Sequence, residues 1–131
     1  MLVADVLAQK GSDVVTVTPE TLVPEVAHII TTRRIGAVVV LHHEDGLVGI
    51  VSERDVVTAL ARHGAGMLQM TAEELMTREV VTVTPETDVE SAVEMMDRGY
   101  FRHLPVMDDR RLAGIISIRD LVTCRASAAP P

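Results

Sequence analysis

Hydrophobic and polar positions follow one another along the chain in an order that occurs twice. In the first half, the β-branched run VVTV at 14–17 predicts a strand, and TPET predicts a turn because Pro19 fixes φ. Apolar residues then recur at helical spacing, and the continuous apolar run at 37–41 predicts a buried strand. A polar turn, a third apolar run at 47–51 and a helix opened by Ser52 complete the order β-α-β-β-α, which a short helix precedes.

The second half repeats this order and some of its letters. VVTVTPET occupies residues 14–21 and returns at 80–87, and LVGIVSERDVV at 47–57 aligns with LAGIISIRDLV at 112–122. Such a small unit cannot bury both faces of its sheet alone, so we expect an α+β fold in which two β-α-β-β-α repeats pack through their sheets about a pseudo-two-fold axis. The expected boundaries are residues 1–62 for the first repeat, 63–70 for a linker, 71–125 for the second repeat and 126–131 for a mobile tail.

The repeated unit resembles the cystathionine β-synthase (CBS) domain, and the tandem pair resembles a Bateman module. The motifs that carry the resemblance are VTVTPET in the first strand and turn, RHLPV at 102–106, GIVSERD at 49–55 and GIISIRD at 114–120. The resemblance covers residues 4–124. It implies a regulatory module that binds AMP, ADP, ATP or NAD(H) in a cleft between the repeats, without a catalytic cofactor, and signals by a conformational or assembly change. Because Bateman modules commonly pair into disk-like dimers, and because this chain is small with a methionine-rich second half, we expect a homodimer.

The Ser-x-x-Asp motif that opens the last helix of each repeat has two interpretations. As a capping box, it only satisfies free N–H groups of the first helical turn. As a binding site, the helix N-terminus and the adjacent arginine would favour phosphate, and the aspartate could accept hydrogen bonds from ribose hydroxyls. The resemblance favours binding. The predicted ribose contacts are Asp55, Asp120, Ser52 and Ser117, and the predicted phosphate contacts are Arg54 and Arg119. Gly49 and Gly114 are expected to let a ligand or a neighbouring backbone approach closely.

The two repeats differ where the central strand begins. Arg102 and His103 precede LPV in the second repeat, whereas Gly36 and Ala37 take their places in the first. The basic pair is either a strand end that reaches solvent or, as the resemblance implies, a phosphate contact, so the two sites should differ. The predicted base contacts are Thr16, Val17, Ala37, Val38, Thr82, Leu104 and Pro105.

Composition excludes several other classes. A net charge of −7 and only two aromatic residues argue against nucleic acid, which requires a basic face or stacking rings. The apolar runs are too short to cross a bilayer, Asp5 interrupts any signal-peptide core, and Cys124 is the only cysteine. We therefore expect no membrane association and a cytoplasmic location, since a lone cysteine fits a reducing compartment.

Two alternatives compete with ligand binding. One is a structural interaction module whose cleft is empty or vestigial. The other is a metal-assisted hydrolase that uses His42 and His43, but adjacent residues in a turn diverge and the spacing is not that of a metal site. Because the polar motifs occur in both repeats, whereas a catalytic residue usually occurs once, we expect neither an enzyme nor a metal site.

Overall fold

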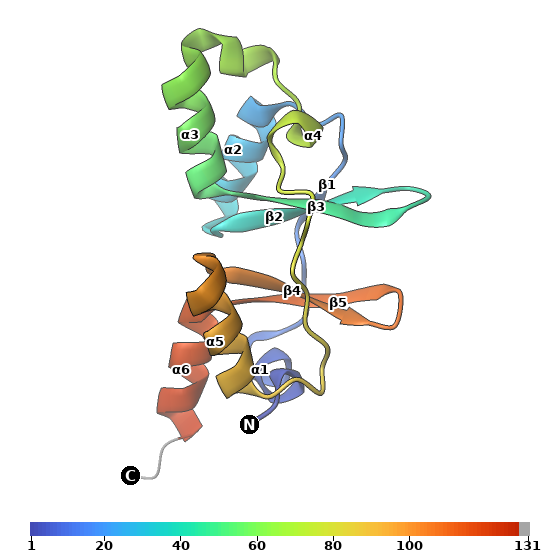
Figure 1. Cartoon of the computed structure of the whole chain (residues 1–131), viewed down its shortest axis with the longest axis vertical. Coiled ribbons are helices and arrows are strands. Elements are labelled where there is room, and N and C mark those ends of the chain that lie inside the picture. Colours follow the sequence, from blue (N-terminus) through green and yellow to red (C-terminus); the bar gives the residue numbers. More distant parts are fainter. Residues whose placement is uncertain (129–131) are drawn as a thin grey trace. The chain divides into compact units, whose positions relative to one another are not determined.

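The computed structural model describes residues 1–128, with the side chains of residues 1–124. The chain forms two compact units: unit 1 joins Met1–Asp13 to the residues from Val81 onward, and unit 2 comprises Val14–Val80 (Figure 1). Each unit combines one small sheet with helices, so the expected α+β class with two repeats is confirmed.

Unit 2 contains the complete predicted pattern of the first repeat. Its elements are β1 (Thr16–Val17), α2 (Val23–Arg33), β2 (Ala37–His42), β3 (Gly46–Ser52), α3 (Glu53–His63), the 3-10 helix η1 (Gly64–Gln69) and α4 (Ala72–Leu75). The sheet order is β1-β2-β3, in which β1 runs parallel and β3 antiparallel to β2. Its core consists of valines from all three strands together with residues of α2 and α4.

Unit 1 contains the second repeat and the N-terminal helix. Its elements are α1 (Val3–Lys10), α5 (Val89–Gly99), β4 (His103–Asp108), β5 (Arg111–Ser117) and α6 (Ile118–Ala128). Helix α6 includes three residues of the predicted tail, and the rest of that tail lies outside the described residues. Leu104, Ile116 and Leu121 are fully buried in the core of this unit.

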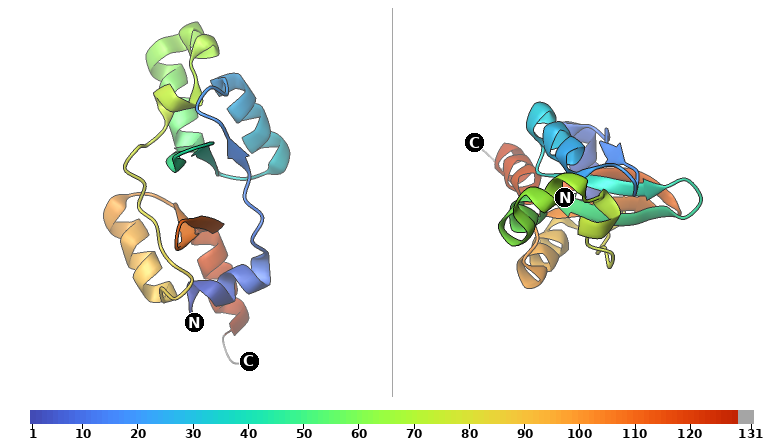
Figure 2. Two further views of the ribbon diagram at one scale, coloured as in Figure 1. Left: turned by 90° about the vertical axis from the view of Figure 1, so that its right-hand side faces the viewer. Right: turned by 90° about the horizontal axis from the view of Figure 1, so that it is seen from above.

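The short helix that precedes each repeat packs on the other repeat. Helix α1 lies against α6 and β5 of unit 1, as Figure 2 shows, and α4 lies against α2 and α3 of unit 2. The compact units therefore cut across the boundaries of the sequence repeats, because the exchanged helices are separated from their own repeat by extended chain.

The repeated phrase VVTVTPET forms the docking point for these exchanged helices. Its turn is closed identically in both units: the Thr21 hydroxyl accepts the N–H of Thr18 at 3.1 Å, and the Thr87 hydroxyl accepts that of Thr84 at 3.1 Å. The carbonyl oxygens of the same turns then accept N–H groups from the first turns of α4 and α1, at 2.7–3.0 Å. These bonds are Ala72 to Thr21, Glu73 to Pro19, Val3 to Thr87 and Ala4 to Pro85.

The first strand of the second repeat is shorter than predicted. In unit 2 the Val39 N–H donates to the Val15 carbonyl at 3.3 Å, and β1 pairs with β2 over two residues. The position equivalent to Val39 is Pro105, which has no N–H to donate. The pairing in unit 1 is therefore limited to a single bridge between Val83 and Val106, and its sheet has two strands.

Candidate functional site

The Ser-x-x-Asp motif forms the same capping box in both units. In unit 2, Asp55 Oδ2 accepts the N–H of Ser52 at 2.8 Å, and Ser52 Oγ accepts the N–H of Asp55 at 3.3 Å. In unit 1, the bonds between Ser117 and Asp120 are 2.8 and 3.0 Å long. The structural interpretation of the motif is therefore correct, and a ribose role would have to use the same carboxylates while they cap the helices.

The capping boxes lie beside the start of the preceding central strand. Ala37 pairs with Ser52, and His103 pairs with Ser117, at the ends of the two hairpins. The first N–H of each final helix donates to this strand start as well, from Glu53 to Gly36 at 3.0 Å and from Ile118 to Arg102 at 2.9 Å. The fold thus brings together, within each unit, the serine, the aspartate and the strand residues that the sequence analysis singled out.

This arrangement limits what the helix N-terminus itself can offer an anion. Of the first three N–H groups of each helix, the first donates to the strand and the third to the capping serine. Charge at the site must therefore come mainly from side chains. The side chains of Arg54, Arg119 and Arg102 are exposed, and that of His103 is half-buried.

The residues predicted to contact a base differ in accessibility. Val17, Val38 and Leu104 belong to the hydrophobic cores of their units. Their side chains are occupied by packing, so they could meet a ligand only through their backbone. Ala37 and Pro105 are buried, Thr82 is half-buried and Thr16 is exposed. A contact between these residues and a base stays a prediction.

The glycines of the third strands accommodate protein side chains. A methyl group built on Gly114 would lie 2.7 Å from Leu7 Cδ2, and one built on Gly49 would overlap the Met76 side chain. Close approach was therefore predicted correctly, but the groups that approach are side chains of the exchanged N-terminal segments. Leu7 and Met76 thereby mark equivalent positions in the two units.

The sequence analysis missed one residue at the site, Lys10, the only lysine in the chain. Its ammonium group, at the C-terminal end of α1, lies 2.9 Å from Asp120 Oδ2 and donates to the Ile115 carbonyl oxygen at 2.5 Å. Partial burial raises the pKa of Asp120, but the hydrogen bonds from Lys10 and Ser117 and the charge of Lys10 outweigh burial and leave it below its ordinary value. The repeat alignment contained a weak signal, because Lys10 stands one residue beyond the aligned helix.

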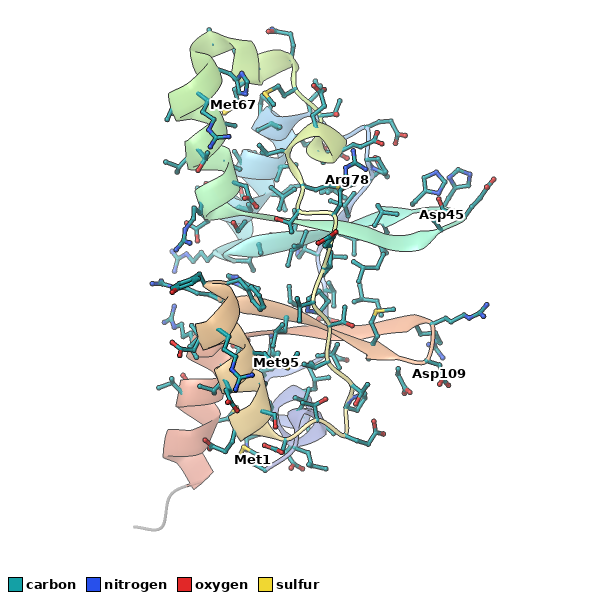
Figure 3. All side chains as sticks on the ribbon, viewed as in Figure 1. Met1, Asp45, Met67, Arg78, Met95 and Asp109 are labelled. Carbon is teal, nitrogen blue, oxygen red and sulfur yellow. The ribbon has the colours of Figure 1, made fainter. Side chains whose placement is uncertain are left out.

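The histidine-rich turn between β2 and β3 is held by its own backbone. His42 Nδ1 accepts the N–H groups of Glu44 and Asp45, each at 3.2 Å. The Asp45 carboxylate also approaches His42 Nδ1, at 3.5 Å. Figure 3 shows Asp45 at the tip of this hairpin. Within residues 1–128, no three His, Cys, Asp or Glu side chains gather as a metal site would require.

No helix among the described residues is both long and apolar enough to cross a bilayer.

The comparisons with known proteins agree with the duplicated architecture. The sequence model of the CBS domain matches residues 3–62 and 72–127. An uncharacterized protein of Methanopyrus kandleri is 34% identical over 112 residues, which are 84% of this chain; the chain spans only 57% of that relative. The crystal structure of the CBS-domain-containing protein ATU1752 from Agrobacterium tumefaciens is 43% identical and superposes with a TM-score of 0.92, covering 95% of this chain and 99% of that one.

A second similar structure contains ligands. The CBS domain pair of protein MJ0100, solved in complex with 5′-methylthioadenosine and S-adenosyl-L-methionine, is 28% identical with a TM-score of 0.86, and 98% of each chain is covered. Two matched repeats, their order along the chain and the shared fold lead to one conclusion. The chain belongs to the CBS-domain family, as a tandem pair of CBS domains.

Proposed function

We propose that this CBS pair is a regulatory module that binds adenosine-containing ligands through the ribose-binding carboxylates Asp55 and Asp120. The observation that carries the proposal is the recurrence, in both units, of a carboxylate fixed by a serine beside the start of the central strand. A carboxylate whose orientation is already fixed loses little entropy when it accepts the two hydroxyls of a ribose. That the two carboxylates face one cleft shared by the repeats stays a prediction.

The ligand class is supported by the adenosine group that both ligands of the MJ0100 pair contain. For this chain we propose AMP, ADP, ATP, NAD(H) or a sulfur-containing adenosine derivative of the same kind. The output would be a change of conformation or assembly, without catalysis by the module itself.

Calorimetric titration tests the proposal. AMP should bind the unmodified protein, and Asp55→Ala and Asp120→Ala should each lose affinity at one site. As helix caps alone, both aspartates would contribute about 0.5–2 kcal/mol to stability and nothing to affinity. Full affinity in both variants, once each is shown by thermal unfolding to be folded, would leave the structural interaction module as the better function.

We also propose that the module forms a homodimer through the final helix of each repeat, α3 and α6. Val57 in α3 and Val122 in α6 occupy equivalent positions in the two repeats, and their exposed fractions are 64% and 57%. Leu60, one turn further along α3, is also exposed. Large apolar side chains that recur at one position of both repeats are better explained by a contact with another chain than by chance. Sedimentation at micromolar concentration measures whether the 14.2 kDa chain is paired.

A further inference from the structure

The edges of β3 in unit 2 and of β5 in unit 1 form different hydrogen bonds. In unit 2, α4 ends at Leu75, and Thr77 continues as extended chain that exchanges two backbone hydrogen bonds with Ile50, at 2.9 and 3.2 Å. In unit 1, α1 continues through Lys10, and the equivalent carbonyl, that of Ile115, accepts a hydrogen bond from the Lys10 ammonium group. A side chain thus replaces a backbone bridge in unit 1.

The same ammonium group also pairs with Asp120, as described above. Unit 2 has no counterpart to this contact. The alignment that superposes Leu7 on Met76 places Glu79 where unit 1 has Lys10, and an acidic residue cannot pair with Asp55. Among the residues that the structure describes, no cation forms an ion pair with Asp55, whose carboxylate accepts hydrogen bonds from Ser52 in its own capping box.

The charges around the two carboxylates differ accordingly. At the two residues before LPV, the Ser-x-x-Asp motif and the end of α1, unit 1 carries Lys10, Arg102, His103 and Arg119 together with Asp120. At the equivalent positions, unit 2 carries Arg54 together with Asp55 and Glu79, Glu53 adds a carboxylate, and Gly36 and Ala37 are neutral. These equivalent positions are therefore more positive in unit 1 than in unit 2, which favours a ligand phosphate in unit 1.

We propose that Lys10 determines the ligand specificity of the unit 1 site, by holding Oδ2 of the carboxylate that a ribose would use. This inference rests on the proposed function. A neutral nucleoside must share the Asp120 carboxylate with the ammonium group, which holds Oδ2, and it offers that group no anionic partner. A phosphorylated ligand gives Lys10 a new anionic partner, which the long flexible lysine side chain can follow. Unit 1 therefore selects phosphorylated ligands, whereas unit 2 accepts the neutral nucleoside.

A variant that removes the ammonium group but keeps most of the side chain tests the proposal. In an Asp55→Asn background, which weakens the unit 2 site, calorimetric titration of adenosine and AMP is compared with and without Lys10→Met. Lys10→Met should tighten adenosine about tenfold, equivalent to about 1.4 kcal/mol, and lower the preference for AMP over adenosine by a similar factor. Lys10→Arg, which keeps the positive charge, should retain the preference for AMP.

The matched control is Arg98→Met. Arg98 lies on α5 of the same unit and pairs with Glu94 at 2.6 Å. Its replacement removes the same positive charge away from Asp120, so the preference for AMP over adenosine should stay unchanged. An AMP preference that Lys10→Met leaves intact overturns the specificity role alone. If neither AMP nor adenosine binds the unmodified protein, the proposed function fails, and the specificity role fails with it.

A second measurement uses the unmodified protein. Because Lys10 is the only lysine, its acetylation by an amine-reactive reagent can be followed on one peptide by mass spectrometry, with the Met1 amine as the internal reference. AMP should slow the acetylation of Lys10 severalfold, and adenosine should not. Equal slowing by the two ligands would overturn the proposal, because Lys10 would then be shielded without reference to the phosphate.

Discussion

Met76 packs directly on the bare backbone of Gly49, and a Cβ atom at that glycine would overlap three atoms of the methionine side chain. Leu7 covers Gly114 in the same way. Each contact joins an exchanged N-terminal segment to the third strand of the unit on which it packs. The exchange of helices between the repeats therefore depends on two glycines that were expected to admit a ligand or a neighbouring backbone.

The first prediction is that Gly49→Ala destabilises the protein by about 1–3 kcal/mol, since an added methyl group in a packed site forces side chains or backbone to shift. Urea unfolding gives the change in the free energy of unfolding. Gly66→Ala is the control, because a Cβ there meets only His63 Cβ at 3.8 Å. Met76→Ala in the Gly49→Ala background should recover part of the loss, and a variant as stable as the unmodified protein would contradict the contact.

The second prediction concerns acid. The pKa of Asp120 is lower in the folded protein than in the unfolded chain, so its ionised form stabilises the fold above the unfolded value of about 3.9. This contribution is lost as the pH falls through the folded-state pKa. Lys10→Met should therefore cost about 1 kcal/mol near pH 6, where Asp120 is charged, and progressively less below pH 4. Urea unfolding of both proteins between pH 3 and pH 6 measures the difference, and a cost that does not vary with pH would argue against the ion pair.

The third prediction is that Arg102→Ala weakens AMP about tenfold and leaves adenosine nearly unchanged. An arginine that contacts phosphate contributes a charge-assisted hydrogen bond of about 1.5–3 kcal/mol, and the exposure of Arg102 places the effect at the lower end. The substitution keeps the backbone carbonyl that accepts the N–H of Ile118, so the helix start should be preserved. Titration of both ligands decides the matter: equal losses would assign Arg102 to the fold.

The fourth prediction concerns assembly. Val57→Asp places a charge in the centre of the exposed apolar face of α3, so a dimer formed there should dissociate at micromolar concentration. Sedimentation velocity of the unmodified protein and the variant measures the change. Ser12→Asp adds the same charge at an exposed loop position and should leave the assembly intact. If Val57→Asp sediments as the unmodified dimer does, the interface must lie elsewhere.

Local sequence patterns determined the order of elements and the capped helix starts. The β-branched and apolar runs give β2, β3, β4 and β5 near their predicted positions, and the four-residue motifs from Ser52 and from Ser117 form the capping boxes. These features depend on residues within about four positions of one another, so their signal is complete in a short stretch of chain. The duplication itself is visible because the repeated phrase carries the same turn twice.

Tertiary structure alone decided which repeat each leading helix covers, and hence the difference between the two carboxylates. Lys10 reaches Asp120 across 110 positions of sequence, a contact that no periodicity reports. The extended segment after α1 places this helix on the second repeat. The position of the helix then determines which glycine, carbonyl and carboxylate its side chains contact. In the sequence of its own repeat, Lys10 is only a cation at the end of a helix. Because α1 packs on the other repeat, Lys10 pairs with Asp120, which was predicted from the sequence to contact a ribose.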